Sequence, residues 1–185
     1  QTATKAAWML SNYISDPSAR NDSDVRIGTI DSWLVWNLSR GTTHVTDHTN
    51  AGVTGLTIAS ARSWNEHVLE ILGIGLHQLP TIVPSSGFIA DALDLPGAPP
   101  IMAIVGDQQG SLVGQGCIEP GRTKITFGTG AMLNTFVGQL APTAAQRTQG
   151  GTFPIVAFSD TSTMSYGTEA IMLAAGTNIE WLRDD

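Results

Sequence analysis

Apolar residues recur at helical spacing along much of the first half of the chain, which predicts a series of short helices. The first helix reaches Ile14 and ends before a polar loop that contains Pro17. The next occupies residues 28–41, where Thr29 is placed to act as the N-cap. Its apolar stripe, which we expect to be buried, consists of Ile30, Trp33, Leu34 and Leu38.

The stretch from 42 to 73 contains a Thr-rich segment and one more helix. Residues 42–56 are rich in Thr and Val, which favours extended or looped chain. The helix that follows begins at a capping box formed by Ser63 and Glu66, and Gly73 stops it.

Strand signals dominate the second half of the chain. Residues 101–105 form an apolar run typical of a buried strand, with a helix over 108–115 after it. Two strands then flank a Gly-Thr-Gly turn within 121–138, and strand character continues through 150–167. The tail from residue 168 is helical in composition. This alternation of helices and strands predicts an α/β fold.

The pattern shifts near residues 116–122, from mixed helices and strands to a hairpin-rich portion. We therefore place a domain boundary there, between a domain over 1–116 and a domain over 117–185. The N-terminus has no initiator Met and starts abruptly, as an excised piece of a longer protein does.

The composition describes an acidic globular chain and excludes several classes of function. Of its 185 residues 42% are hydrophobic, which suits a folded core. A net charge of −7 offers no basic surface to nucleic acid. No apolar run approaches the roughly 18 residues of a membrane helix, and no signal peptide is visible. The single cysteine, Cys117, fits the reducing compartment of the cytoplasm.

Asp107 stands where the apolar run 101–105 passes through Gly106 into a polar segment. One interpretation is structural, because Asp is a favoured N-cap and accepts hydrogen bonds from unpaired helix N–H groups. The other is functional, because ligands of α/β sheets gather beyond the carboxyl ends of strands, where Asp107 and Gln108 are expected. Spacing alone leaves both interpretations open.

The turn in the segment FGTGAM has a similar ambiguity. Its glycines allow positive φ angles and close approach of a ligand to the backbone, and successive N–H groups in such a turn can bind an anion. Glycine-containing hairpin turns are also common without any ligand.

Two other groups of residues carry less weight. His44, Asp47 and His48 have the chemistry of metal ligands, but the Thr-rich segment does not fix their spacing and no fourth ligand is visible, so we predict no metal site. The tryptophans are expected to pack in the core or at its boundary, although one of them could stack on a carbohydrate. They are Trp8, Trp33, Trp36, Trp64 and Trp181.

Several stretches of the chain resemble motifs of the FGGY carbohydrate kinases, in the order and approximate spacing of the glycerol kinases within that family. They cover nearly the whole chain and read GTIDSWLVWNL, HVTDHTNAG, GDQQGSLVGQG, GRTKITFGTGAM and AAGTNIEWLRD. The resemblance implies the two-domain, ribonuclease H-like fold shared by sugar kinases, actin and the heat-shock ATPases. It places 1–116 late in the first, substrate-side domain and 117–185 at the start of the second, nucleotide-side domain.

The resemblance also implies a substrate site. Asp107 takes the role of the catalytic base that accepts the proton of the substrate hydroxyl, and Gln108 hydrogen-bonds a neighbouring hydroxyl. Met132 occupies the position that lies against the carbon backbone of the polyol. Phosphoryl transfer asks more for placement of the base than for its strength, so an ionised Asp at a helix N-terminus suits the role.

The nucleotide side is implied in the same way. Thr129 and Gly130 match the second phosphate loop of the family, which contacts the terminal phosphates of ATP. Gly176 and Glu180 match ATP-side contacts at the start of the last helix. Mg²⁺ is expected to bridge the phosphates and to be held largely through water.

Some positions depart from the glycerol kinase pattern. Residues 49–54 read TNAGVT where glycerol kinases commonly have Thr-Asn-Ala-Ser-Arg-Thr. Met132 replaces a phenylalanine, and its flexible side chain could admit a different or larger polyol. Glu180 replaces a glutamine and brings a negative charge toward the nucleotide.

The sequence therefore predicts ATP-dependent phosphorylation of a polyol hydroxyl in the complete protein, with glycerol converted to glycerol 3-phosphate. Another sugar or polyol kinase of the same family is the first alternative. A non-catalytic, actin-like module that binds a nucleotide or sugar is the second. We expect the 185-residue chain alone to be inactive, and its exposed apolar surface to favour a homo-oligomer.

Overall fold

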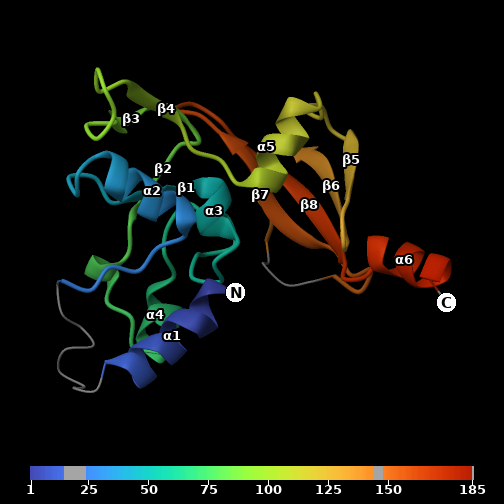
Figure 1. Cartoon of the computed structure of the whole chain (residues 1–185), viewed down its shortest axis with the longest axis horizontal. Coiled ribbons are helices and arrows are strands. Elements are labelled where there is room, and N and C mark those ends of the chain that lie inside the picture. The colour runs from blue at the N-terminus through green and yellow to red at the C-terminus, as the bar shows by residue number, and fades with distance from the viewer. Residues whose placement is uncertain (15–23, 144–147, 185) are drawn as a thin grey trace.

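The computed structural model describes residues 1–14, 24–143 and 148–184, which form a mixture of helices and strands (Figure 1). The predicted polar loop around Pro17 lies outside these residues. The helices are α1 (Thr2–Tyr13), α2 (Ile30–Leu38), α3 (His48–Gly52), α4 (Glu66–Leu72), α5 (Asp107–Gly114) and α6 (Gly176–Asp184), with a 3₁₀ helix, η2, at Leu76–Gln78. The strands are β1 (Val45–Asp47), β2 (Thr81–Val83), β3 (Ser86–Asp91), β4 (Pro100–Ala103), β5 (Thr123–Phe127), β6 (Ala131–Gly138), β7 (Phe153–Ser159) and β8 (Met164–Met172).

The strands form separate small sheets in the first half of the chain and one larger sheet in the second. β1 pairs with β2 in parallel, and β3 pairs with β4 in an antiparallel ladder. The larger sheet has four strands in the order β5-β6-β8-β7, and all of its neighbours are antiparallel. The β-rich second half and the hairpin around the Gly-Thr-Gly turn are thus confirmed.

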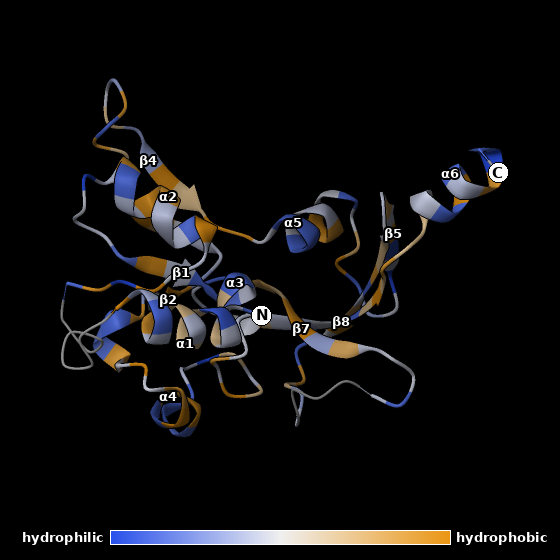
Figure 2. Cartoon of the chain, turned by 60° about the horizontal axis from the view of Figure 1, so that its bottom comes forward, coloured by the Kyte–Doolittle hydropathy of each residue, from blue (hydrophilic) through white to orange (hydrophobic). Residues whose placement is uncertain are grey.

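Helix α5 packs on one face of the four-stranded sheet (Figures 1 and 2). The contact is a small buried cluster made by Leu112, Cys117, Phe136 and Ala157. Helices α1 and α4 close a different cluster, which is centred on Leu10, Leu56 and Leu69. The burial of Leu112 therefore holds α5 against the sheet.

Helix α2 turns a polar face inward, which contradicts the predicted apolar stripe. Three residues of that stripe lie on the outer face instead: Ile30 is 69% exposed, Trp33 60% and Leu34 47%. The buried positions are Asp31, Ser32 and Val35. The reason lies in Asp31, whose carboxylate accepts hydrogen bonds from the hydroxyls of Thr29 and of Thr46 on β1, the latter at 2.8 Å. Thr29 is the N-cap residue as predicted, but its side chain bonds to Asp31 rather than to the backbone.

Other local predictions fail by a few residues. The cap of α4 is Asn65, whose Oδ1 accepts from the Val68 N–H at 3.3 Å, and not the predicted capping box. Gly73 does end this helix, with φ of 66°. Residues 48–52 form the short helix α3 within the segment predicted as extended or looped. The tail enters its helix only at Gly176, because 164–172 belong to β8.

The predicted buried strand over 101–105 is also wrong in its burial. β4 ends at Ala103 and lies at an edge, with Met102 and Val105 exposed. Most of the tryptophans lie outside the core as well: Trp8, Trp33 and Trp181 are exposed, and Trp36 and Trp64 are half-buried. The described helices include none with the length and apolarity that crossing a membrane requires.

Helices α2 and α6 carry exposed apolar side chains, which lead to a testable expectation; Figure 2 shows where the two helices lie. They are Ile30, Trp33 and Leu34 on α2 and Ile179, Trp181 and Leu182 on α6. Because soluble monomers rarely leave such groups uncovered, we expect the 185-residue chain to self-associate. Size-exclusion chromatography with light scattering checks its mass, and replacing Trp33 and Leu34 by Ser should lower the associated fraction. A monomeric mass at every concentration contradicts the expectation.

Candidate functional site

Asp107 opens helix α5 and lies at the surface. The N-cap of α5 is Gly106, and Asp107 is the first residue of the helix. The helix therefore begins one residue earlier than predicted. Its Oδ1 accepts from the N–H of Gln108 at 2.8 Å, and the side chain is exposed. The N-cap interpretation is therefore wrong in its position, and the carboxylate is open to solvent.

The turn before α5 is held from the opposite side by α3. The N–H of Gly106 donates to the Thr49 hydroxyl at 2.8 Å, and that hydroxyl donates in turn to the Asp47 carboxylate. A Cβ at position 106 would lie 2.5 Å from the Gln109 Oε1. A larger residue at this position would therefore displace the end of the Gln109 side chain.

A lysine that the sequence analysis missed lies beneath the first turn of α5. Lys124 on β5 is only 3% exposed, and its Nζ donates to the Gln108 Oε1 at 2.5 Å and to the Thr126 Oγ1 at 2.7 Å. Burial lowers the pKa of Lys124, and the nearby carboxylates of Glu169 and Asp107 oppose that shift. The sequence offered only a weak signal, a charged residue between Thr123 and Ile125 in the predicted strand TKITF.

Lys124 heads a row of polar residues that crosses the sheet. The strand register pairs it with Asn134 on β6, which is paired with Glu169 on β8. The Asn134 Nδ2 donates to the Glu169 Oε2 at 2.6 Å, while its Oδ1 is buried and has no partner among the described residues. Burial raises the pKa of Glu169, and the Asn134 hydrogen bond and Lys124 act against that rise.

Met132 belongs to the same face of the sheet. Residues of a strand alternate between faces, so Met132 and Asn134 share one side of β6. The register places Met132 opposite Thr126, the second partner of Lys124. The structure therefore brings Met132 to the sheet face from which Lys124 contacts Gln108.

The predicted nucleotide-side residues meet at the tip of the β5–β6 hairpin. The N–H of Gly176 donates to the Gly128 carbonyl at 3.0 Å, and the N–H of Ala175 donates to the Thr129 carbonyl at 2.8 Å. The first turn of α6 is therefore bonded directly to the Gly-Thr-Gly turn (Figure 1).

Close packing, and not backbone angle, explains these glycines. Gly130 and Gly176 are not among the described glycines with positive φ, so that expected reason does not apply. A Cβ on Gly130 would lie 2.5 Å from the Met172 carbonyl, and one on Gly176 would lie 2.5 Å from the Gly128 carbonyl. We call this contact between the hairpin tip and the start of α6 the glycine seam. Thr129 at its centre is exposed, and Glu180 lies exposed one helical turn further along α6.

The structure thus gathers the predicted residues into two neighbouring groups. Asp107, Gln108 and Met132 lie about the first turn of α5, and the glycine seam holds the others. Strand β5 connects the groups, since Thr126 is three residues before Thr129 and extended chain spans about 10 Å over that distance.

The candidate metal ligands of the Thr-rich segment serve a structural role. The Asp47 carboxylate accepts from the N–H groups of Thr49 and Asn50, both at 3.0 Å. His48 Nδ1 lies 3.0 Å from the Ser159 hydroxyl, and burial lowers the pKa of His48. Among the described residues no cluster of His, Cys, Asp or Glu side chains is placed to hold a metal ion.

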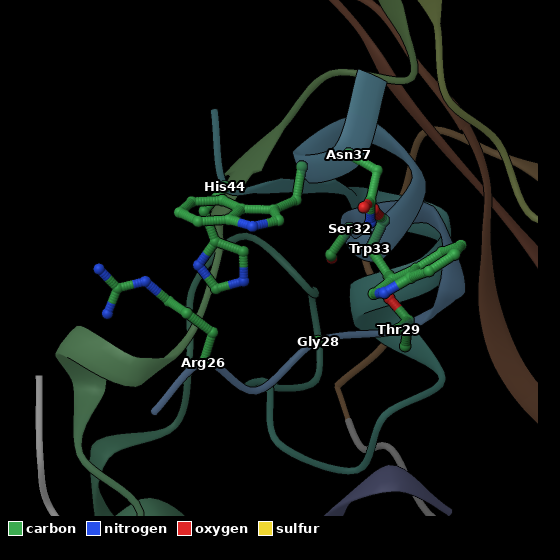
Figure 3. Close-up of a pocket in the computed structure, with 8 residues that line it drawn as sticks. Arg26, Gly28, Thr29, Ser32, Trp33, Asn37 and His44 are labelled. Atoms are coloured by element: carbon green, nitrogen blue, oxygen red, sulfur yellow. The ribbon is translucent and has the colours of Figure 1, made fainter. Parts of the chain in front are cut away.

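A separate pocket of about 400 Å³ lies beside α2 and contains none of the predicted site residues (Figure 3). The Trp36 ring forms one wall, with the His44 ring edge-on at 5.9 Å and the Arg26 guanidinium 6.0 Å from its centroid. The lining consists of Arg26, Gly28, Thr29, Ser32, Trp33, Trp36, Asn37 and His44.

Comparison with curated proteins finds close relatives along the whole chain. It is 38% identical over its full length to the glycerol kinase of Halorhodospira halophila, and 40% identical over 99% of its length to that of Nostoc sp.. It covers 36% of the length of each of these relatives.

Solved structures show the same relationship. The glycerol kinase of Plasmodium falciparum with ADP matches 97% of this chain with a TM-score of 0.83 and 28% identity, and the chain covers 36% of it. A ligand-bound xylulose kinase from Lactobacillus acidophilus shares the fold, with a TM-score of 0.79 at 21% identity. The predicted α/β fold of the sugar kinases is therefore confirmed. The sequence model of the N-terminal domain of the FGGY family of carbohydrate kinases matches residues 1–114. The chain therefore belongs to the FGGY family of carbohydrate kinases.

Proposed function

We propose that the protein containing this chain transfers the terminal phosphoryl group of ATP to a hydroxyl of a small polyol, with glycerol as the first candidate. The observation that carries the proposal is the pair Asp107 and Gln108 on the first turn of α5, in a chain 38% identical to a glycerol kinase. An exposed carboxylate beside an anchored carboxamide presents an acceptor and a donor to neighbouring hydroxyl groups.

Asp107 is the proposed catalytic base. It accepts the proton of the attacking hydroxyl while that oxygen forms its bond to the phosphorus of the terminal phosphoryl group, and ADP leaves. The transition state of such transfers is loose, so the base must be well placed rather than strong. The first turn of α5 supplies that placement, since Gly106 and Leu112 fix the helix on both sides.

The glycine seam is the proposed contact for the phosphates of ATP. Thr129 is exposed at the hairpin tip, and Gly130 and Gly176 allow the hairpin tip and the start of α6 to pack closely beside it. Glu180 further along α6 is the proposed neighbour of the nucleotide. The P. falciparum relative was solved with ADP, which supports this use of a nucleotide.

Mg²⁺ is the proposed companion of the nucleotide. When bound, it would neutralise negative charge on the phosphates of the nucleotide, and we expect it to be held largely through water.

We also propose a division of the chain into domains, in line with the family model, which matches residues 1–114. We assign 1–116 to the substrate side and 117–185 to the nucleotide side, so that Asp107 and the glycine seam belong to different domains. The chain covers 36% of the relatives' length, and we expect it to be inactive alone because closure over both substrates needs the complete protein.

A polyol or sugar other than glycerol is the second candidate. The observation that favours it is Met132, a flexible side chain on the sheet face shared with Lys124. Glycerol and a panel of larger polyols, compared by kcat/KM, decide between the two candidates.

Replacing Asp107 by Asn tests the base in the complete protein. Asn keeps the size and polarity but cannot take the proton, so turnover should fall by about two to four orders of magnitude. Release of ADP with each polyol measures the effect, and thermal unfolding should change little. The exposed Asp91, replaced by Asn, is the matched control. Near-normal turnover in Asp107→Asn rules out this assignment.

Replacing Gly176 by Ala tests the glycine seam. The new Cβ would lie 2.5 Å from the Gly128 carbonyl, so the seam must open at a cost of about 1–3 kcal/mol. Affinity for ADP, measured by calorimetry on the complete protein, should fall about tenfold or more. Gly114→Ala is the control, because a Cβ there meets nothing within 4 Å. Equal ADP affinity in both variants means that the seam does not hold the nucleotide.

A further inference from the structure

Lys124 is an unusual residue to bury beneath an active site. Lysine is almost never fully buried unless its ammonium group is paired, because leaving water is costly for the charge. Here the ammonium group donates two hydrogen bonds, one to Gln108 and one to Thr126. One of these partners is the residue proposed to bind the substrate.

The contact with Lys124 determines which way the Gln108 carboxamide is turned. A lysine ammonium group has three donors and no acceptor. The atom of Gln108 that lies 2.5 Å from Nζ must therefore be the oxygen, and the NH₂ group is directed to its other side. The orientation of this amide follows from chemistry, and not from an arbitrary choice between oxygen and nitrogen.

A donor on Gln108 next to an acceptor on Asp107 recognises a particular arrangement of hydroxyl groups. A hydroxyl that donates its proton to Asp107 can have a neighbour whose oxygen accepts from the Gln108 NH₂ group. The complementary substrate is a vicinal diol, in which one hydroxyl reacts and the adjacent one is held.

We propose that Lys124 is a positioning residue that fixes the polarity of Gln108 and so selects substrates with two adjacent hydroxyl groups. This inference rests on the proposed function of Asp107 and Gln108, and it assigns to Lys124 a role that acts through its hydrogen bond to Gln108.

The surroundings of Lys124 fit that role. Of the carboxylates that favour its charged form, Glu169 acts most strongly; it lies at the other end of the buried row and is held by the Asn134 amide at 2.6 Å. Asp107, at the surface, adds to that effect.

The first test replaces Lys124 by Met in the complete protein. Glycerol offers adjacent hydroxyls and 1,3-propanediol does not, so the ratio of their kcat/KM values reports the diol preference. The substitution should raise the KM for glycerol about tenfold, the scale of one hydrogen bond, and leave the KM for ATP unchanged. The exposed Lys5, replaced by Met, is the matched control.

The second variant, Gln108→Glu, keeps the partner of Lys124 and so protects the fold. Its carboxylate still accepts from the ammonium group but cannot donate, so the diol preference should fall as in Lys124→Met. In a Gln108→Ala background the Lys124→Met substitution should have no further effect on the KM for glycerol. A diol preference that Gln108→Glu retains, or additive effects of Lys124→Met and Gln108→Ala, overturns the proposal.

Crystal structures of the unliganded protein test the positioning role of Lys124 independently of any kinase activity. The wild type should show one Gln108 conformer with its oxygen on Lys124, and Lys124→Met should show several. That result stands even if the wild type phosphorylates no polyol, in which case the proposed function fails and Lys124 still orients the amide. An unchanged, ordered Gln108 in Lys124→Met contradicts the positioning role.

Discussion

A buried carboxylate, Asp47, is the interaction on which the arrangement of the chain depends. It is fully buried at the end of β1 and accepts from the backbone and side chains of Thr49 and Asn50. The Ser85 hydroxyl donates to it at 2.6 Å, and Ser85 in turn contacts Ser159 on β7. One charge thereby ties β1, α3, the chain before β3 and the edge of the large sheet. Because an unpaired buried charge is costly, these segments keep one arrangement.

The hydrogen bonds around Asp47 also position the candidate site. The Thr49 hydroxyl donates to Asp47 and also accepts a hydrogen bond from the Gly106 N–H, which holds the start of α5 in place. Lys124 fixes the same turn from the sheet below through Gln108. The glycine seam then positions α6 by direct backbone contact at the far end of β5. Chemistry that needs placement more than reactivity is served by such a rigid frame.

The sequence predicted the elements whose signals are local and missed those that depend on partners far along the chain. The Gly-Thr-Gly hairpin and the stop of α4 at Gly73 are local, and both were predicted. The inward face of α2 was mispredicted, because Asp31 is bound by Thr46 fifteen residues away. Of the site, motif resemblance supplied Asp107, Gln108 and the seam. Lys124 was not predicted, because nothing in the neighbouring sequence shows that this strand residue contacts Gln108, sixteen residues earlier on α5.

The central claim is that the first turn of α5 holds adjacent hydroxyl groups while the glycine seam holds the phosphates. A crystal structure of the complete protein with ADP and glycerol tests it directly. The account predicts one glycerol oxygen within about 3.2 Å of the Asp107 carboxylate, its neighbour at the same distance from the Gln108 nitrogen, and the ADP phosphates at Thr129 and Gly130. Glycerol bound away from α5, or ADP away from the hairpin tip, would contradict it.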